Sequence, residues 1–465
     1  MKIKFIGAAQ TVTGSMHYIE AAGKKFILDC GLIQGKRKES FELNKKFDQF
    51  APSELDFVIL SHAHIDHAGN LPNLVKHGFN GNIYCTFATR DLASLMLTDS
   101  AHIQEKDVEF VNKRRRKQGK NLFEPLYTQN DVDKTIPLFV GLNYHREFEI
   151  TQDISIIFFD AGHILGSAIT YLRIKEEGRI IDFGFSGDIG RPNLPILRDP
   201  EKIPNVDYFI CESTYGGRFH DNFDMTQSKM IEVLQRAEQR KAKIIVPSFS
   251  VGRTQELVIV LNKIFEQKLV KKFPIFVDSP LSVSATGVFR MHPECFDLET
   301  SQFLLENKDP FGFDNLTYIT DVEESKKLNE LSGPCMIISS SGMAEAGRIL
   351  HHLANNIQNP NNIILIVGYS AEHTLGRKIV EREPVVKIFG EEYNLNAEVV
   401  VFNSLSAHAD SNELLQYCNN FDKSKLQKIF LVHGDLDQQQ KFKSRLEENG
   451  FLNIIIPTRA DEFQI

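Results

Sequence analysis

The sequence predicts an α/β protein of two lobes, one inserted into the other. Its 465 residues exceed the roughly 250–300 residues at which a single hydrophobic core stops growing. Apolar runs followed at once by metal-capable side chains form two clusters, one ending at Glu212 and one beginning near Val399. Between them, strand-like and helix-like stretches alternate, which is typical of a largely parallel, doubly wound sheet.

The most informative stretch of the first lobe is 61–67, which reads SHAHIDH and follows the apolar run 57–60. It places His62, His64, Asp66 and His67 within six consecutive residues. Neutral imidazole and carboxylate groups are zinc ligands. A bound dication also offsets the repulsion and desolvation that such a cluster otherwise suffers. The stretch therefore predicts a metal site; the alternative is a polar turn rich in histidine.

The same arrangement recurs elsewhere in this lobe, because further apolar runs are followed by a metal-capable residue within a few positions. These residues are Asp29, Asp160, His163, Asp188, Glu212, His408, Asp410 and His433. Loops on one rim of a rigid sheet commonly carry catalytic groups. A lone histidine after a strand is more often structural. The agreement of several runs with 61–67 nevertheless favours one shared site.

The insert carries small, polar loops after the predicted strands 243–246, 273–277, 335–338 and 363–367. Such loops offer backbone N–H groups that suit phosphate, and nearby arginines could pair with its oxygens. The alternative is that the serines and glycines are caps and turns. The predicted RNA- or phosphate-binding residues are Ser248, Arg253, Ser340, Ser341, Arg348 and Arg377.

The composition indicates a cytoplasmic protein with no membrane partner. Apolar runs such as 363–367 are too short to span a bilayer, and 1–7 reads as a first strand rather than a signal peptide. Six scattered cysteines are expected to be buried free thiols. A net charge of −8 argues against a general nucleic-acid-binding protein, although a local positive groove stays compatible with it. The one strong basic run, 113–117, is expected to be a solvated helix face or loop.

These motifs resemble those of the metallo-β-lactamase superfamily and, within it, the β-CASP nucleases. The resemblance covers essentially the whole chain. In the first lobe it is carried by SHAHIDHAGNLP from Ser61, AGHILGSA from Ala161, FSGDIGR from Phe185, CESTYGG from Cys211, SAHAD from Ser406 and VHGD from Val432. In the insert, VDSPLS from Val277, SSSGMAEAGRILHHL from Ser339 and VGYSAEHTLGR from Val367 are similar to the polyadenylation-factor endonuclease branch.

The resemblance implies a metallo-β-lactamase αββα sandwich with an inserted doubly wound, parallel-sheet β-CASP domain. The expected boundaries are 1–213 and 397–465 for the sandwich and 214–396 for the insert. No further RNA-binding domain is expected before Met1. The resemblance also assigns roles: one zinc to His62, His64 and His163, a second to Asp66, His67 and His433, a bridge to Asp188, a supporting role to Asp29, and acid catalysis to His408 with Glu212.

The implied function is a zinc-dependent ribonuclease that uses two Zn²⁺ and acts on single-stranded RNA. In this hypothesis the metals activate water for attack on phosphorus, and His408, oriented by Glu212, protonates the departing 3′-oxygen. Asp66, Glu212 and His408 are thus the predicted catalytic residues. Cutting within the RNA and cutting from a 5′ end both stay open, as does a homodimer. The rival functions are hydrolysis of a small-molecule thioester or lactam, and a non-catalytic RNA-binding scaffold.

Overall fold

The computed structural model describes residues 1–35, 37–220, 224–306, 308–368, 370, 373–402 and 406–465. The chain forms two compact units. Unit 1 comprises 1–192, 198–219 and 408–465, and unit 2 comprises 193–197 and 220–407. Positions 369, 371 and 372 of the VGYSAEHTLGR motif, and positions 404 and 405 before SAHAD, lie outside the described residues.

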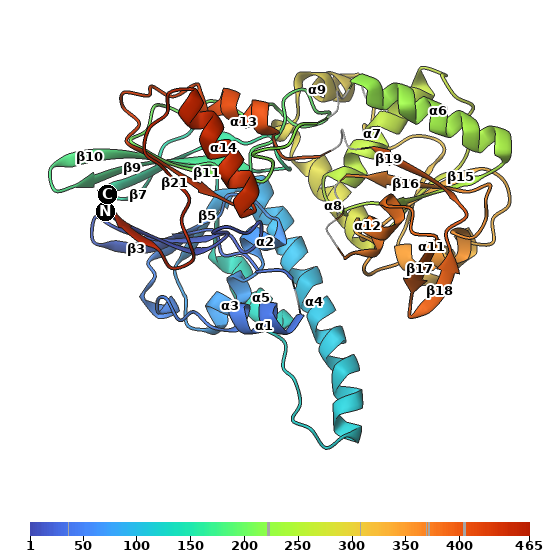
Figure 1. The fold of residues 1–465 in the computed structure, drawn as a ribbon, viewed down its shortest axis with the longest axis horizontal. Coiled ribbons are helices and arrows are strands. Elements are labelled where there is room, and N and C mark those ends of the chain that lie inside the picture. Colours follow the sequence, from blue (N-terminus) through green and yellow to red (C-terminus); the bar gives the residue numbers. More distant parts are fainter. Residues whose placement is uncertain (36, 221–223, 307, 369, 371–372, 403–405) are drawn as a thin grey trace. The chain divides into compact units, whose positions relative to one another are not determined.

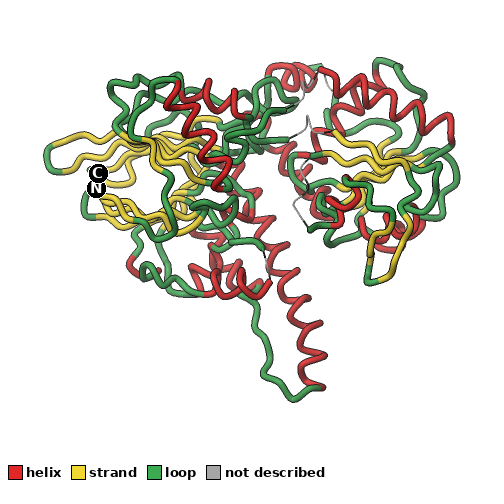
Figure 2. Tube along the Cα trace, viewed as in Figure 1, coloured by secondary structure: helices red, strands yellow, loops and turns green. Residues whose placement is uncertain are grey.

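Unit 1 contains two seven-stranded sheets, which lie face to face with helices on the outside (Figures 1 and 2). The order in the first sheet is β22 (Glu462–Gln464), β1 (Lys2–Gly7), β2 (Met16–Ala21), β3 (Lys24–Leu28), β4 (Phe57–Ile59), β5 (Asn82–Thr86) and β6 (Phe139–Leu142). The order in the second is β21 (Ile454–Ile455), β20 (Lys428–Val432), β11 (Tyr208–Glu212), β10 (Arg179–Phe185), β9 (Ala168–Glu176), β8 (Ile154–Asp160) and β7 (Phe148–Thr151).

The inner faces of the two sheets share one hydrophobic core. Ile3 and Phe5 of β1 pack there with Phe183 and Phe185 of β10, and all four are essentially inaccessible to solvent. In β8 the side chains alternate between buried and half-buried positions. This period of two is expected of a strand whose two faces lie in different environments.

Helices cover the outer faces of the sandwich. The helices of unit 1 are α1 (Arg37–Lys45), α2 (Ile65–Ala68), α3 (Leu71–Lys76), α4 (Phe87–Lys117), α5 (Gln129–Thr135), α13 (Ser411–Cys418) and α14 (Leu436–Glu448). A second hydrophobic cluster joins α13 and α14 to the outer face of the second sheet, with Leu414 and Phe442 packed near Phe209. The structure therefore confirms the predicted αββα sandwich.

Unit 2 is built on one six-stranded sheet whose paired neighbours are all parallel. Its order is β14 (Leu316–Ile319), β13 (Ile275–Asp278), β15 (Cys335–Ser339), β12 (Lys243–Pro247), β16 (Ile363–Val367) and β19 (Glu398–Phe402). Its helices are α6 (Asp224–Arg240), α7 (Arg253–Glu266), α8 (Pro280–Met291), α9 (Leu298–Leu305), α10 (Val322–Leu328), α11 (Ile349–Asn356) and α12 (Leu375–Val380), and β17 (Val385–Ile388) and β18 (Glu391–Asn394) form a hairpin. The predicted doubly wound insert is confirmed.

The boundaries between the two units differ from the expected boundaries 213/214 and 396/397. The strand β19 pairs with β16 and so belongs to the sheet of unit 2, whereas the expected boundary placed it in the sandwich. Unit 1 resumes only at His408. The apolar run 399–402 indicates that a strand forms, but it does not specify which sheet accepts that strand.

The six cysteines are buried free thiols, as expected from their apolar surroundings. Among the described residues, no helix is both long enough and apolar enough to cross a bilayer. The cytoplasmic location and the homodimer stay predictions.

Candidate metal centre

The predicted ligands of unit 1 stand where its strands end. After β4 ends at Ile59, the next loop carries His62 and His64, and the one-turn helix α2 carries Asp66 and His67. Asp188 follows β10 and Glu212 ends β11, while His163 follows β8 and His433 follows β20. Because β10, β11 and β20 pair in parallel, their carboxyl ends meet at one edge of the sheet. The predicted convergence is therefore present in the fold.

One cluster brings together His62, His64, His163 and Asp188. The Nδ1 atom of His64 lies 3.2 Å from Nε2 of His62 and 3.2 Å from Nε2 of His163. The Oδ2 atom of Asp188 lies 3.5 Å from Nε2 of His62 and 3.4 Å from Nε2 of His163. Ligand atoms 2.0–2.1 Å from a tetrahedral zinc ion are ~3.3 Å apart. These separations fit the edges of such a coordination shell.

A second cluster contains Asp66, His67 and His433. The Nε2 atoms of His67 and His433 are 3.0 Å apart, and Oδ2 of Asp66 lies 3.5 Å from Nε2 of His433. The Oδ1 atom of Asp188 lies 3.3 Å from Nε2 of His67. Asp188 thus turns one carboxylate oxygen toward each cluster.

The donors fit a pair of cations. Within the described part of the chain, Oδ1 of Asp188 is buried and accepts no hydrogen bond. A buried, unsatisfied carboxylate oxygen is costly unless it is paired or coordinates a metal. All seven predicted metal ligands offer imidazole nitrogen or carboxylate oxygen, which are zinc donors. The arrangement therefore supports a metal site.

Neighbouring side chains fix the orientation of several ligands. The Nδ1–H group of His67 donates to Oδ2 of Asp29 at 2.6 Å, which leaves Nε2 for the cluster. Asp29 in turn accepts hydrogen bonds from the backbone N–H and the hydroxyl of Ser61. The hydroxyl of Thr214 lies 3.0 Å from Nδ1 of His433. Such partners hold the tautomer and ring orientation of a metal-binding histidine.

Sequence reasoning found Asp29 at the end of an apolar run, and the resemblance gave it a supporting role, but the sequence analysis missed Thr214. The position of Thr214 in the CESTYGG motif, two residues after Glu212, could have indicated its role.

Burial and charge set the protonation of the centre. Burial lowers the pKa of His64 to about 4, and it lowers the pKa of His62 well below its usual value, so both imidazoles are neutral near pH 7. Although burial raises the pKa of Asp188, the surrounding histidines, His433 first, lower it well below its usual value. Burial lowers the pKa of His67, but the carboxylates of Asp188 and Asp29 outweigh burial and raise it. A metal would displace that proton on binding.

His408 and Glu212 form a pair beside the bridging carboxylate. The Nδ1 atom of His408 lies 3.1 Å from Oε1 of Glu212 and 3.9 Å from Oδ2 of Asp188. Burial lowers the pKa of His408, but Glu212 and Asp188 outweigh it and raise the pKa to about 9. Glu212 is buried, and it also accepts the backbone N–H groups of Ile189 and Thr214. Both carboxylates therefore favour the protonated form of the imidazole, and Glu212 orients its ring at the centre.

In unit 2, the predicted phosphate-binding arginines engage local acceptors. Arg253 is buried and pairs with Glu256 one turn along α7. Arg348 pairs with Asp278 at 2.6 Å, and Arg377 pairs with Glu381 at 2.7 Å. The residue types alone did not reveal these carboxylate partners.

The three predicted serines also contribute to internal hydrogen bonding. Ser248 is buried and its hydroxyl accepts from Thr254, and the hydroxyl of Ser340 lies 2.9 Å from that of Ser279. The hydroxyl of Ser341 accepts from the backbone N–H groups of Glu345 and Ala346. Phosphate binding by all six residues stays a prediction.

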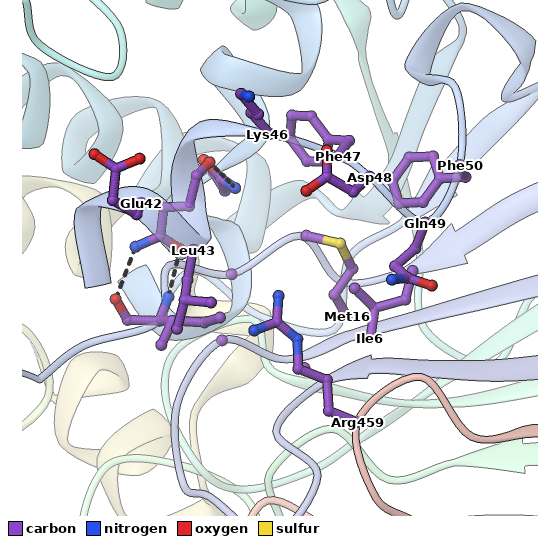
Figure 3. A pocket seen from close by; sticks show the side chains of 16 residues that line it. Ile6, Met16, Glu42, Leu43, Lys46, Phe47, Asp48, Gln49, Phe50 and Arg459 are labelled. Atoms are coloured by element: carbon purple, nitrogen blue, oxygen red, sulfur yellow. Dashed lines mark hydrogen bonds between the residues drawn. The ribbon is translucent and has the colours of Figure 1, made fainter. Parts of the chain in front are cut away.

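A separate cavity of about 100 Å³ lies in unit 1 between α1 and the ends of β1 and β2 (Figure 3). The guanidinium of Arg459 points between Leu43 and Met16 (Figure 3). Glu42, Asp48 and Lys46 add charges of both signs to its wall. None of the clustered histidines and carboxylates lines this cavity, so it is distinct from the metal centre.

The chain matches three family models. Residues 10–248 match the metallo-β-lactamase superfamily, 254–379 the β-CASP domain, and 392–457 a "Zn-dependent metallo-hydrolase RNA specificity domain".

Among solved structures, a crystal structure of a protein of unknown function from Enterococcus faecalis V583 has a TM-score of 0.54 and 12% sequence identity. The match covers 99% of each chain, and at this identity it concerns the fold alone.

Several curated proteins are similar over most of this chain. A ribonuclease of Thermus thermophilus is 33% identical over 94% of this chain and 93% of its own length. The transcription termination factor FttA of Methanocaldococcus jannaschii is 28% identical over 100% of this chain and 72% of its own length. An RNase J-like protein of the same organism is 28% identical over 98% of each. Taken with the two ligand clusters and the αββα sandwich, these matches show that the chain belongs to the β-CASP family of the metallo-β-lactamase superfamily.

Proposed function

We propose that this chain is a metal-dependent ribonuclease that hydrolyses phosphodiester bonds of single-stranded RNA. The observation that carries the proposal is the position of Asp188, whose two oxygens face two separate ligand clusters. Paired metals ~3.5–4 Å apart serve in-line displacement at phosphorus. The match of 392–457 to an RNA specificity domain and the ribonuclease name of a close relative support RNA as the substrate.

Zinc is the proposed metal, with two ions per chain. Nitrogen from histidine and oxygen from aspartate make up the whole donor set, which zinc accepts in hydrolytic sites. When bound, the two ions would supply an activated water and neutralise charge on the phosphate.

His408 is the proposed general acid. Its Nδ1–H donates to Glu212, which orients the imidazole ring beside the ligand clusters. A pKa of about 9 keeps the imidazole protonated near pH 7, as an acid that must deliver a proton requires. Proton transfer to the departing 3′-oxygen of the ribose would leave a 5′-phosphate on the other product. Glu212 orients the ring and sustains its charge.

Two substitutions separate metal binding from proton transfer. Asp66→Ala removes a ligand of the second cluster, so cleavage should be lost together with bound zinc. His408→Ala should lower the cleavage rate by ~10²-fold or more while zinc stays bound. Cleavage of labelled single-stranded RNA and metal content by mass spectrometry measure both effects.

Matched controls are Asp153→Ala and His351→Ala, which replace exposed residues outside the clusters. If His408→Ala cleaved RNA as fast as the unchanged protein, the general-acid assignment would be rejected.

The two rival functions give different outcomes in simple assays. Turnover of nitrocefin or S-lactoylglutathione without action on RNA would favour a small-molecule hydrolase. RNA binding with no cleavage and no retained metal would favour a scaffold. Matched circular and linear RNAs distinguish the cleavage modes, because an enzyme that needs a 5′ end leaves the circle intact.

A further inference from the structure

The helix α4 extends far beyond the core of unit 1. Its 31 residues correspond to a length of ~46 Å. Its last buried apolar residue is Ala101, and its C-terminal half projects past the sheets of unit 1 before 118–127 returns alongside it (Figure 1). Residues 102–124, here called the arm, are not used by the proposed mechanism.

The two limbs of the arm are joined by specific contacts. The side chain of Asn112 donates to the backbone carbonyl of Phe123 and accepts from its N–H, each at 2.9 Å. The guanidinium of Arg115 lies 4.7 Å from the ring centroid of Phe123 and donates to the carbonyl of Asn121. At the base of the arm, the hydroxyls of Ser100 and Tyr127 are 2.7 Å apart. These contacts give the arm a defined conformation.

The outer half of the arm is strongly basic. Positions 113–123 contain six lysines and arginines and no acidic residue, in a chain whose net charge is −8. Arg114, Arg116, Lys117 and Lys120 are exposed, and none forms an ion pair within the described residues. The negative end of a helix favours a cation or two in its last turn. That effect does not explain the positive charge of Lys120, which lies beyond the end of the helix, or the number of basic side chains without an acidic partner.

Apolar side chains are interleaved with these cations. The ring of Phe110 is 78% exposed, and Leu122 and Phe123 are exposed as well. Exposed aromatic rings among basic side chains are the combination that single-stranded nucleic acids use, because bases stack on the rings while phosphates meet the cations.

The base of α4 is bonded to the loop that carries His163. The hydroxyls of Thr86 and Thr89 each donate to the carbonyl of Gly166 at 2.7 Å. From that point to Lys113 the helix runs ~40 Å. With stacked nucleotides ~3.4 Å apart, the distance corresponds to about a dozen nucleotides.

We propose that the arm is a second, sequence-independent RNA-binding surface, which holds the strand at a distance from the bond being cut. The proposal rests on RNA being the substrate. Long RNAs reach both the metal centre and the basic end of the arm, whereas RNAs of a few nucleotides reach only the centre. The arm therefore raises the affinity for long RNA without taking part in hydrolysis.

The test replaces the exposed cations together: Arg114→Gln, Arg116→Gln, Lys117→Gln and Lys120→Gln. Glutamine is a good helix former, so circular dichroism should be unchanged. The control replaces four basic residues elsewhere in unit 1 that make no cation–π contact among the described residues: Lys175, Arg179, Lys441 and Lys443, each by Gln. A third variant, Phe110→Ala, tests stacking alone.

Binding is measured on metal-stripped full-length protein with a 40-nucleotide single-stranded RNA over a series of salt concentrations. We expect the arm variant to bind at least about 10-fold more weakly. The slope of log binding constant against log salt concentration should become smaller in magnitude by up to ~3, since each phosphate contact contributes ~0.7 to it for single strands. Phe110→Ala should weaken binding several-fold without changing that slope. The control should stay within about twofold of the unchanged protein.

Cleavage by the zinc-loaded proteins is measured in parallel on the 40-nucleotide RNA and on an 8-nucleotide RNA. The arm variant should cleave the short RNA at the normal rate and the long RNA with a raised KM. Equal affinity and equal salt dependence for the arm and control variants would overturn the proposal. So would a change in sedimentation without a change in RNA affinity, because it would assign the arm to a contact between copies of the chain. If neither the unchanged protein nor any variant cleaved either RNA, the ribonuclease proposal would be rejected. The proposal for the arm would still be tested, because the binding experiment requires no cleavage.

Discussion

Single side chains of the metal centre act through the neighbours that hold them. His67 presents Nε2 because Asp29 accepts its other N–H, and His433 is fixed by Thr214. Glu212 and Asp188 lie beside His408 and raise the pKa of its imidazole. Substitutions of the supporting partners should therefore change a pKa or a metal affinity before they change the fold.

Glu212→Gln tests this dependence for the general acid. In the unchanged protein, cleavage that needs protonated His408 should decline as the pH rises through about 9. Glutamine removes the nearest negative charge, so the pKa of His408 should fall and the alkaline decline should begin about one pH unit lower or more. The pH–rate profile of RNA cleavage measures the shift.

The control for that profile is Glu294→Gln. Glu294 lies 2.7 Å from Nδ1 of His292 in unit 2, so it has the same kind of partner away from the centre. An unchanged profile in Glu212→Gln, or an equal shift in both variants, would contradict the proposed role of Glu212.

Asp160 allows a pH test of stability. Burial is the main cause that raises the pKa of this carboxyl to about 8, and the charge of Glu201 adds to this rise. Between about pH 4 and pH 8 the folded protein keeps a proton that the unfolded chain releases, so this group makes the protein less stable as the pH rises, by up to ~1.4 kcal/mol per pH unit.

Asp160→Asn removes that titration and keeps an oxygen that can accept the N–H of Gly162. Urea unfolding at pH 5.5 and pH 7.5 should show the variant gaining stability over the unchanged protein as the pH rises. A difference that is constant across this range would show that Asp160 is ionised in the folded state.

At the scale of elements, the sequence predicted which runs form strands and which loops carry ligands. His62, His64, Asp66 and His67 were identifiable because they are adjacent in the sequence. His163, Asp188 and His433 were identifiable because each follows a buried strand. The partners of Arg253 and Arg348 were not identifiable. Their carboxylates lie one helical turn away or on another strand, and the spacing in the sequence does not reveal such ion pairs. The sheet that accepts β19 is likewise settled by packing against β16.

Gly31 shows how closely the elements approach beneath the centre. A Cβ atom at this position would lie 1.6 Å from the backbone oxygen of Asp66. Gly31→Ala should therefore displace the backbone that carries Asp66 and His67, with loss of bound metal and ~1–3 kcal/mol of unfolding free energy. Metal analysis and urea unfolding measure the two effects.

Gly287→Ala is the matched substitution, because its Cβ would meet nothing within 4 Å on α8. It should stabilise the protein by ~0.5–1 kcal/mol and leave metal content unchanged. Full metal content in Gly31→Ala would show that the loop can accommodate the added methyl group.

At the scale of the whole molecule, the units have separate hydrophobic cores, and both ligand clusters and the pair of His408 and Glu212 lie in unit 1. A ligand that binds only the folded state stabilises that state. We therefore expect a zinc chelator to lower the unfolding temperature of unit 1 by several degrees and that of unit 2 by less. Calorimetry with and without chelator measures this, and Asp66→Ala, which removes a ligand of the second cluster alone, should reduce the effect of the chelator.

The second cluster joins Asp66 to His433, which are 367 positions apart in the sequence. During translation, Asp66 is made early, but its partner imidazole is made only 367 residues later. Nascent chains that stop short of position 433 therefore lack a complete second cluster. As a result, a nascent chain that ends before His433 should be unable to cleave the messenger RNA from which it is being translated.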